Sequence, residues 1–204
     1  MTRLTEIAGI AAPLPIENLD TDQIMPKQFL RIIDKAGLSE GLLYDLRFDA
    51  EGEPRPDCVL NQVAYRDACI LIGGSNFGCG SSREHAVWGL QQFGFEAVIA
   101  PSFAEIFYSN AMNNRLLLVQ LEREEIDVLL HDVSTHPAAR LHIDLDRQTV
   151  TVAGGRVFTF PLGARHKQMV IDGMDTIDLT LASLPAIEAF EQAHFERHRW
   201  AAVL

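Results

Sequence analysis

Three short apolar runs, separated by stretches expected to be helical, occupy the middle of the sequence and restrict its fold most strongly. The runs are ACILIGG, EAVIAP and LLLVQL, at residues 68–74, 96–101 and 116–121. Each is typical of a buried strand, because it is apolar almost throughout and has the length of a strand. The stretches between them, 81–94 and 102–114, are expected to be helices. A strand followed by a helix and another strand favours parallel pairing, so we predict a parallel β-α-β core.

Each expected helix opens on a serine that a glutamate follows three residues later. Ser81 with Glu84, and Ser102 with Glu105, fit the capping box. In that motif the serine hydroxyl accepts a hydrogen bond from a backbone N–H of the first turn. Gly94 is placed to end the first helix. The pattern therefore predicts that both serines cap helices.

The segments around this core have weaker patterns. The polar stretch RFDAEGEPRPD, at 47–57, is rich in glycine and proline and predicts a mobile surface loop. An acidic stretch at 122–130 indicates a short helix. Apolar and polar residues then alternate at 141–145, which predicts a half-exposed hairpin or meander. Together the patterns predict a mixed α/β fold with a parallel core.

The last part of the chain is expected to be helical from Pro185 to Trp200. Helical spacing places Ile187, Phe190 and His194 on one side, and we expect this side to face the core. This region would form a C-terminal helical flank of the α/β fold.

The chain has 204 residues, of which 48% are hydrophobic and 22% are charged. These values are ordinary for a globular protein and are sufficient for a substantial core. We therefore expect a single domain over residues 1–204, with a helical extension over about 183–204. The formal net charge of −11 argues against nucleic acid or an anionic membrane surface as a partner, because both require a basic face.

The cysteines and the apolar content indicate a cytoplasmic protein. No apolar run approaches the length of about 20 residues that a membrane helix needs. The N-terminus lacks the apolar core of a secretory signal. Cys58, Cys69 and Cys79 cannot all pair, and none lies in a CxxC motif. We expect them to be reduced thiols.

The stretch GGSNFGCGSSREHAVWG, at 73–89, combines glycines, serines and charged residues. A phosphate site would suit a glycine-rich loop before a helix, but the stretch has no lysine and no P-loop motif. A metal site at Cys79 would need further ligands, which the spacing of the cysteines does not supply. Ser81 fits a plain helix cap. Arg83 in a first helical turn would oppose the helix dipole, however, which favours an anion such as a carboxylate beside it.

Three motifs in this order carry a family resemblance. They are NLDTDQIMPKQFL at 18–30, GSNFGCGSSREHA at 74–86 and SFAEIFYSNAMNNRLLLV at 102–119. The second closely resembles the signature of the swivelling domain of the aconitase superfamily, and the others resemble its flanking motifs. Within that superfamily the chain is similar above all to the small subunits of hydro-lyases that isomerise 2-isopropylmalate. The resemblance covers most of the chain and implies a swivelling β/β/α domain with mixed sheets.

The resemblance also implies a division of labour between two chains. A separate large subunit would carry a [4Fe-4S] cluster, and this chain, which would hold no metal, would close over it. The reaction would convert 2-isopropylmalate to 3-isopropylmalate through isopropylmaleate, in leucine biosynthesis. A related hydratase, for homoaconitate or methylmalate-type acids, is the alternative, because one alkyl group discriminates by only about 1–3 kcal/mol. A non-catalytic carboxylate-binding module is a further alternative.

The family's motif also assigns expected roles to residues of the serine loop. Ser81 would be the base that removes the proton next to the substrate carboxylate. Ser82 would assist binding, and Arg83 would pair with a carboxylate of the substrate. His85 belongs to the same motif and is expected near the site, although a helical histidine there more often packs or forms hydrogen bonds than transfers protons.

The N-terminal motif contributes a second group of candidates. The resemblance places Asp20, Thr21 and Asp22 near the active site as supporting residues, while a turn that orders the loop is the plain interpretation of the two aspartates. Phe29 and Leu30 could face the alkyl group of the substrate, and they could equally be core residues.

Overall fold

The computed structural model describes residues 3–30 and 37–201. One seven-stranded sheet runs through it in the order β4-β3-β2-β1-β5-β6-β7. The strands are β1 (Glu6–Leu14), β2 (Ala68–Gly73), β3 (Ala97–Ala100), β4 (Leu117–Gln120), β5 (Arg140–Asp144), β6 (Thr149–Val152) and β7 (Val157–Thr159). Strands β1 to β4 pair in parallel, whereas β1–β5, β5–β6 and β6–β7 are antiparallel. The predicted mixed α/β fold with a parallel core is confirmed.

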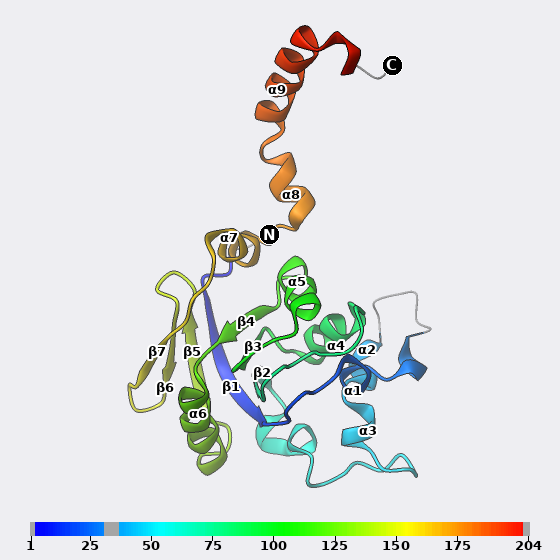
Figure 1. Cartoon of the computed structure of the whole chain (residues 1–204). Helices are drawn as coiled ribbons and strands as arrows, with labels where there is room; N and C mark the ends of the chain where they lie inside the picture. The colour runs from blue at the N-terminus through cyan, green and yellow to red at the C-terminus, as the bar shows by residue number, and fades with distance from the viewer. Residues whose placement is uncertain (1–2, 31–36, 202–204) are drawn as a thin grey trace.

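Helices surround the sheet, and the last two project away from it (Figure 1). The α-helices are α1 (Thr21–Ile24), α2 (Leu38–Gly41), α3 (Tyr44–Arg47), α4 (His85–Phe93), α5 (Glu105–Asn113), α6 (Arg123–Thr135), α7 (Ala164–Asp172), α8 (Thr176–Leu181) and α9 (Leu184–Arg197). Short 3₁₀ turns are η1 (Lys27–Phe29), η2 (Val59–Asn61), η3 (Val63–Tyr65) and η4 (Arg199–Ala201). No described helix is long and apolar enough to cross a membrane.

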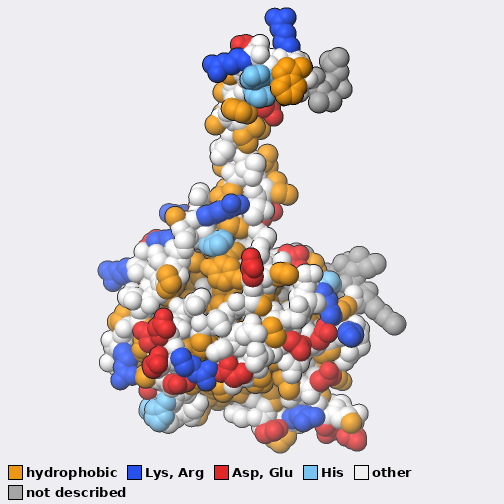
Figure 2. Space-filling model, in the orientation of Figure 1, with side chains coloured by type: hydrophobic (Ala, Val, Ile, Leu, Met, Phe, Trp, Pro, Cys, Tyr) orange, Lys and Arg blue, Asp and Glu red, His pale blue; other side chains and the backbone are white. Residues whose placement is uncertain are grey.

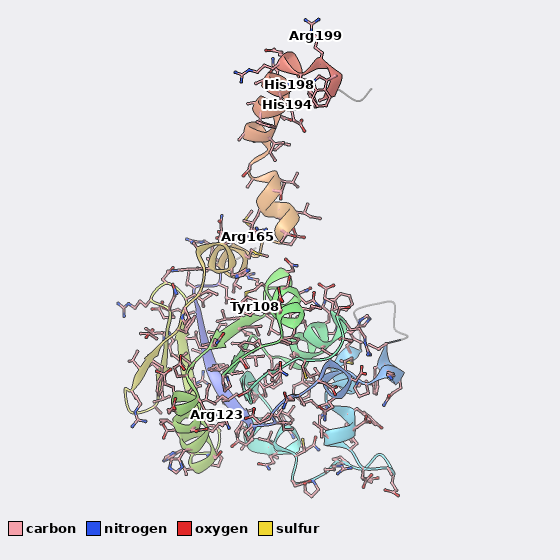
Figure 3. The ribbon with its side chains drawn as sticks, viewed as in Figure 1. Tyr108, Arg123, Arg165, His194, His198 and Arg199 are labelled. Atoms are coloured by element: carbon pink, nitrogen blue, oxygen red, sulfur yellow. The ribbon has the colours of Figure 1, made fainter. Side chains whose placement is uncertain are left out.

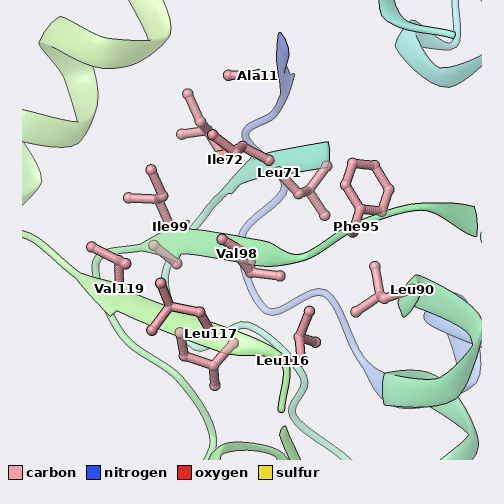
Figure 4. Packing of buried hydrophobic residues seen from close by; sticks show 14 of the residues in the cluster. Ala11, Leu71, Ile72, Leu90, Phe95, Val98, Ile99, Leu116, Leu117 and Val119 are labelled. Atoms are coloured by element: carbon pink, nitrogen blue, oxygen red, sulfur yellow. The ribbon is translucent and has the colours of Figure 1, made fainter. Parts of the chain in front are cut away.

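The parallel strands form the centre of the core. Every residue of β3 is buried, and β2 is buried except for partial exposure of Cys69. Strands that are buried on both faces appear in the sequence as continuous apolar runs, which is why β2 and β3 could be predicted. Ile72, Ile99 and Val119 lie side by side across β2, β3 and β4 (Figure 4).

The alternating stretch is also confirmed. Leu141, Ile143 and Leu145 are at most 2% exposed, and they belong to or directly follow β5 in the antiparallel meander. Their polar neighbours lie on the other face, as a sheet with one solvated face requires.

Strand β1, in the middle of the sheet, is an element for which the sequence made no prediction. It pairs with β2 through Ala12 and Leu71 and with β5 through Ile7 and Ile143. Its small residues allow close approach: a Cβ on Gly9 would lie 2.2 Å from the sulfur of Cys69. Runs of alanine, glycine and proline carry little strand signal, because strand propensity comes from branched and aromatic side chains.

The two predicted serine caps are wrong. Helix α4 begins at His85 after Glu84, and α5 begins at Glu105 after Ala104, in each case without a side-chain cap. The hydroxyl of Ser102 instead accepts a hydrogen bond from the backbone N–H of Asn76 at 2.8 Å. A capping box is a local pattern, and here tertiary partners compete successfully for the hydroxyls. The predicted end of α4 is confirmed, since Gly94 has a φ of 117°.

The predicted polar loop at 47–57 is exposed over most of its length and is organised by its own hydrogen bonds. Asp49 accepts hydrogen bonds from the backbone N–H groups of Glu51 and Glu53. Arg47 anchors the start of the loop by donating to the carbonyl oxygens of Ser39 and Leu42, and desolvation lowers the pKa of this half-buried guanidinium.

The acidic stretch at 122–130 forms α6, which begins with a capping box of Glu122 and Glu125 and extends to Thr135.

The predicted C-terminal helix is present as α9, but the expectation that it faces the core is wrong. Ile187 and His194 are only partly shielded, and Phe190 is 67% exposed. The helix stands away from the sheet and buries none of its residues (Figure 1). Helical spacing predicted which residues share a side, but it could not show whether this chain supplies the surface that covers them.

Candidate functional site

The candidate site lies where β1 and β2 end. Two segments, 17–25 after β1 and 74–84 after β2, are joined there by backbone hydrogen bonds. The N–H of Asn18 donates to Ser75, that of Gly78 to Leu19 and that of Thr21 to Cys79, at 2.8 to 2.9 Å. Because β1 and β2 are parallel, both segments leave the same edge of the sheet, which is where ligands bind in open α/β sheets.

The glycines of the loop permit this close packing. A Cβ on Gly74 would lie 2.5 Å from the carbonyl oxygen of Ile16. Gly78 has a φ of 76°, and a Cβ there would lie 2.2 Å from the ring of Phe107. These glycines are explained by contacts within the protein, so they need no phosphate ligand.

Ser81 is held by contacts of its hydroxyl and of its backbone, and its carbonyl oxygen also lies 3.4 Å from Oγ1 of Thr21. Its Oγ lies 2.9 Å from Oγ1 of Thr21 and accepts a hydrogen bond from Nε of Arg83 at 2.7 Å. Its backbone N–H donates to Oγ1 of Thr21 at 2.9 Å. Thr21 is 2% exposed, so its hydroxyl is fixed inside the protein while Ser81 is half-buried at the surface.

These contacts can place two donors on one serine oxygen. Oγ1 of Thr21 already accepts the N–H of Ser81, and its own hydrogen can point to Oγ of Ser81. If Ser81 loses its proton, Thr21 must be the donor of that pair. Thr21 and Arg83 would then both donate to the alkoxide, which is the arrangement that stabilises an oxyanion.

Arg83 precedes α4, so the argument that placed it in the first helical turn is wrong. Its Nη2 forms an ion pair with Oδ1 of Asp22, and the arginine side chain is 27% exposed. Nη1 of Arg83 is shielded from solvent and has no hydrogen-bond partner among the described residues. A guanidinium with an unused donor has capacity left for an acceptor such as a carboxylate.

The two aspartates of the N-terminal motif do different things. Asp20 caps α1: its carboxylate accepts the N–H of Gln23, and the Gln23 side chain accepts the N–H of Asp20. This confirms the interpretation of Asp20 as a residue that orders the turn. Asp22 instead contacts Arg83, so it helps to set the position of the guanidinium.

The other motif residues are placed around this centre. Ser82 is exposed, and its carbonyl oxygen accepts a hydrogen bond from Nδ2 of Asn110 at 3.1 Å. The ring of His85 packs against Trp88 with centroids 4.8 Å apart, as expected for a packing histidine.

Phe29 and Leu30 are both half-buried. The ring of Phe29 lies 5.2 Å from that of Tyr44 and covers Gly41, where a Cβ would lie 2.4 Å from it. The contacts of Phe29 are therefore with α2 and α3, and the residues that follow Leu30, at 31–36, lie outside the described part of the chain.

Asn110 of α5 and Asn114, which directly follows this helix, belong to the site, and the sequence did not single them out. Asn114 donates to a carboxylate oxygen of Glu84 and accepts a hydrogen bond from the indole N–H of Trp88 at 2.9 Å. With the bond from Asn110 to Ser82, this fixes the segment from Ser82 into α4 against α5. Both asparagines lie in the motif at 102–119 that carries the family resemblance, but that motif gave neither residue a role of its own.

An ion pair joins the site segments to α6. One carboxylate oxygen of Glu17 pairs with Arg123, and the other accepts the N–H of Ser75 at 2.8 Å. The hydrogen bond from Arg123 is the main reason that the pKa of Glu17 is lowered. Arg123 lies at the start of α6 (Figure 3), so this contact links three segments near the site.

The residues present do not fit a metal cluster. Cys58, Cys69 and Cys79 are unpaired thiols, and the sulfur of Cys79 donates to the carbonyl oxygen of Asn18 at 3.2 Å. Burial is the main cause of the raised pKa of Cys69. Within residues 3–30 and 37–201, no three His, Cys, Asp or Glu side chains come together as ligands.

This chain is similar in sequence to known proteins of one family. The model of the aconitase C-terminal domain matches residues 1–124, and the LeuD_N model matches residues 127–164. A 3-isopropylmalate dehydratase small subunit 1 from Chromobacterium violaceum is 56% identical, covering 98% of this chain and 94% of the relative. The small subunit from Roseobacter denitrificans is 48% identical, with coverage of 98% and 100%.

A solved structure is also similar to this chain. The 3-isopropylmalate dehydratase LeuD of Methanocaldococcus jannaschii is 27% identical and superimposes with a TM-score of 0.65, covering 90% of this chain and 99% of its own. The relatives are matched over nearly their whole length, and the matched model includes both segments of the site. This chain belongs to the family of 3-isopropylmalate dehydratase small subunits, within the aconitase superfamily.

Proposed function

We propose that this chain, together with a large subunit, catalyses the isomerisation of 2-isopropylmalate to 3-isopropylmalate through isopropylmaleate. The observation that carries the proposal is the pair of contacts on Oγ of Ser81, from Thr21 and from Arg83, at the edge of the sheet. Membership of the family supports the substrate, because relatives 43–56% identical over nearly the whole chain are named for this reaction.

Ser81 is the proposed base. Its Oγ, as the alkoxide, takes the proton from the carbon next to a substrate carboxylate, and the electrons of that C–H bond form the double bond of isopropylmaleate. The hydroxyl of the neighbouring carbon leaves on the large-subunit side. A serine hydroxyl is ordinarily too weak an acid for this role, so the two donors on its oxygen are essential to it. Addition of water in the other orientation gives the isomer.

Arg83 is the proposed partner of a substrate carboxylate. Its Nη1 has no acceptor among the described residues, while its Nη2 is held by Asp22. A substrate carboxylate that bound Nη1 and displaced Asp22 from Nη2 would form the forked contact that arginine favours. Ser82, exposed beside it, is the proposed second binding residue, through its hydroxyl or its N–H.

The remaining family expectations stay proposals. Because no set of ligands for a cluster forms among the described residues, we propose that the large subunit holds the [4Fe-4S] cluster. Phe29 and Leu30 are the proposed contacts of the isopropyl group, because they follow the segment that holds Thr21. The net charge of −11 argues against nucleic-acid or anionic-membrane partners, and the three free cysteines support a cytoplasmic protein.

The test is anaerobic reconstitution with the large subunit from the same cells, followed by an assay of isopropylmaleate hydration. The account predicts that both 2- and 3-isopropylmalate form, and that neither subunit is active alone. A complex that instead hydrates homoaconitate, or the unsaturated acid formed by dehydration of a methylmalate, would transfer the mechanism to the alternative substrates. A complex without hydratase activity on any of these acids would contradict the proposal.

A further inference from the structure

The C-terminal residues 175–201 form an arm (Figure 1). It projects from the other described residues, 3–30 and 37–174, which we call the α/β body. None of its residues is buried. Large apolar side chains are exposed along its whole length, as Figure 2 shows. They are Ile177, Leu181, Leu184, Phe190, Phe195 and Trp200, with exposed fractions between 39% and 85%. The body, in contrast, buries most of its large apolar side chains in one core.

Most of the large apolar side chains of α9 gather on one side. Leu184, Ile187, Phe190 and His194 follow one another at intervals of three, three and four residues, which places them on a single helical face. The ring of Phe190 stacks on that of His194 at 5.5 Å, and His198 continues the row towards the tip (Figure 3). The opposite face carries small residues such as alanine and is suited to solvent.

The apolar face of the arm needs another protein surface to pack against. Helix α9 has 14 residues, and isolated helices of about 12–15 residues are only marginally stable in water. Helical stability in proteins comes mostly from packing of the apolar face, and the body of this chain does not supply that packing. A contiguous apolar surface left open is typical of a protein–protein interface.

The charges of the arm identify the chemistry of the covering surface. The arm carries five carboxylates, of Asp175, Asp178, Glu188, Glu191 and Glu196, against two guanidinium groups, of Arg197 and Arg199. A second copy of this chain would bring another acidic arm and a net charge of −11 towards it, which is electrostatically unfavourable. A partner with an apolar groove and a basic rim is complementary.

We infer that the arm is the element by which this chain docks onto its large subunit, in an apolar groove with a basic rim. The inference rests on the proposed function, which requires that partner. The curated relatives that match 200 of the 204 residues leave at most four residues unmatched, so α9 lies within the matched region. These relatives are named small subunits, which by name have a larger partner.

The arm and the candidate site are at opposite edges of the sheet. The N–H of Leu4, just before β1, donates to the carbonyl oxygen of Ile171 in α7, which places the base of the arm near the amino end of β1. Ser81 lies beyond the carboxyl end of the same strand and its neighbour. The arm can therefore hold the two subunits together from the side away from the site, which raises the local concentration of the site near its partner.

The experiment compares two single substitutions in the full-length chain. Phe190→Asp places a charge on the apolar face, and Ala189→Asp places the same charge on the opposite face. Binding to the anaerobically purified large subunit is measured by sedimentation velocity, and hydration of isopropylmaleate is measured as the small subunit is titrated.

The inference predicts that Phe190→Asp weakens binding to the large subunit by about tenfold or more, as expected for an aromatic residue central to an interface. Ala189→Asp should change it less than about twofold, and both variants should reach the wild-type rate at saturation.

Three results would overturn the inference. The first is equal binding by both variants. The second is a wild-type chain that does not bind the large subunit. The third is a dimer of this chain that Phe190→Asp dissociates without changing binding to the large subunit, since a second copy would then cover the arm. Failure of the proposed function would give a different result. The wild-type complex would form and would depend on Phe190, but it would not hydrate isopropylmaleate.

Discussion

The hydroxyl oxygens of Thr21 and Ser81 lie 2.9 Å apart and join two segments that are sixty residues apart in the sequence. Thr21 is buried at the start of α1, after β1, whereas Ser81 is at the end of the glycine-rich loop after β2. The contact explains why a serine that fits a helix cap does not cap α4. It also connects the N-terminal motif to the proposed base, because Thr21 determines where the serine oxygen lies.

Replacing Thr21 by valine removes the hydroxyl but keeps the shape. The alkoxide of Ser81 would lose one of its two donors, so kcat should fall by about tenfold to a hundredfold while KM stays within about twofold. The backbone N–H of Ser81 would also lose its acceptor, at a cost of about 1–3 kcal/mol in the free energy of unfolding. Steady-state kinetics and thermal unfolding of the complex measure both effects. Thr21→Ser should restore the rate, and a wild-type kcat for Thr21→Val would contradict the role of the contact.

Replacing Arg83 by lysine tests the carboxylate contact. An ammonium group cannot form the forked contact or donate from Nε to Ser81, so kcat and substrate affinity should fall together. Arg123→Lys is the matched control, because Arg123 pairs with Glu17 at the same edge and is not proposed to touch substrate. Unchanged kinetics for Arg83→Lys, or equal losses in the two variants, would contradict the assignment.

Asn110 is predicted to be a positioning residue. Its Nδ2 donates to the carbonyl oxygen of Ser82, so Asn110→Ala should loosen the segment that carries the site. We expect kcat to fall severalfold, KM to change little, and the melting temperature to stay within about 3 °C, since the bond is exposed. Asn110→Asp, which keeps the shape without the donor, should behave like alanine. The exposed neighbour Ser109→Ala is the control, and a loss of rate there as large as in Asn110→Ala would argue against positioning.

Glu17 gives the fold a dependence on pH. Arg123 lowers its pKa in the folded protein, so the folded value lies below the ordinary value of 4.5. The stabilisation is therefore fully present above the unfolded pKa and is lost as the pH falls through the folded pKa. Because the pair is exposed, Glu17→Gln should lower the melting temperature by no more than about 3 °C near pH 7. The difference from wild type should fade as the pH falls below the ordinary pKa of 4.5, and a difference that grows on acidification would show that the sign is wrong.

The parts of the fold that follow from local apolar pattern were predictable. Strands β2 to β4 are buried on both faces and therefore appear as continuous apolar runs, and the residues around Ile143 alternate because one face of the meander is solvated. Strand β1 was not predicted, because alanine and glycine residues that fit closely against β2 carry little pattern of their own.

The site was only partly predictable, because its contacts are between distant segments. The sequence indicated the serines and Arg83 through their motif, and local capping rules assigned Asp20 correctly. The same rules failed for Ser81, whose partner is sixty residues away, and they gave no role to Asn110. Local pattern likewise placed Phe190 towards a core that lies elsewhere in the molecule.

The most direct test of the account is the rate of isopropylmalate isomerisation by the reconstituted complex that carries Ser81→Ala. The account predicts that turnover falls by more than about a hundredfold while the affinity for substrate stays within about threefold, because the proton acceptor is lost and Arg83 remains. The complex should still form, since the proposed docking arm is unchanged. A fall in turnover of less than about tenfold would show that Ser81 is not the base and would contradict the central claim.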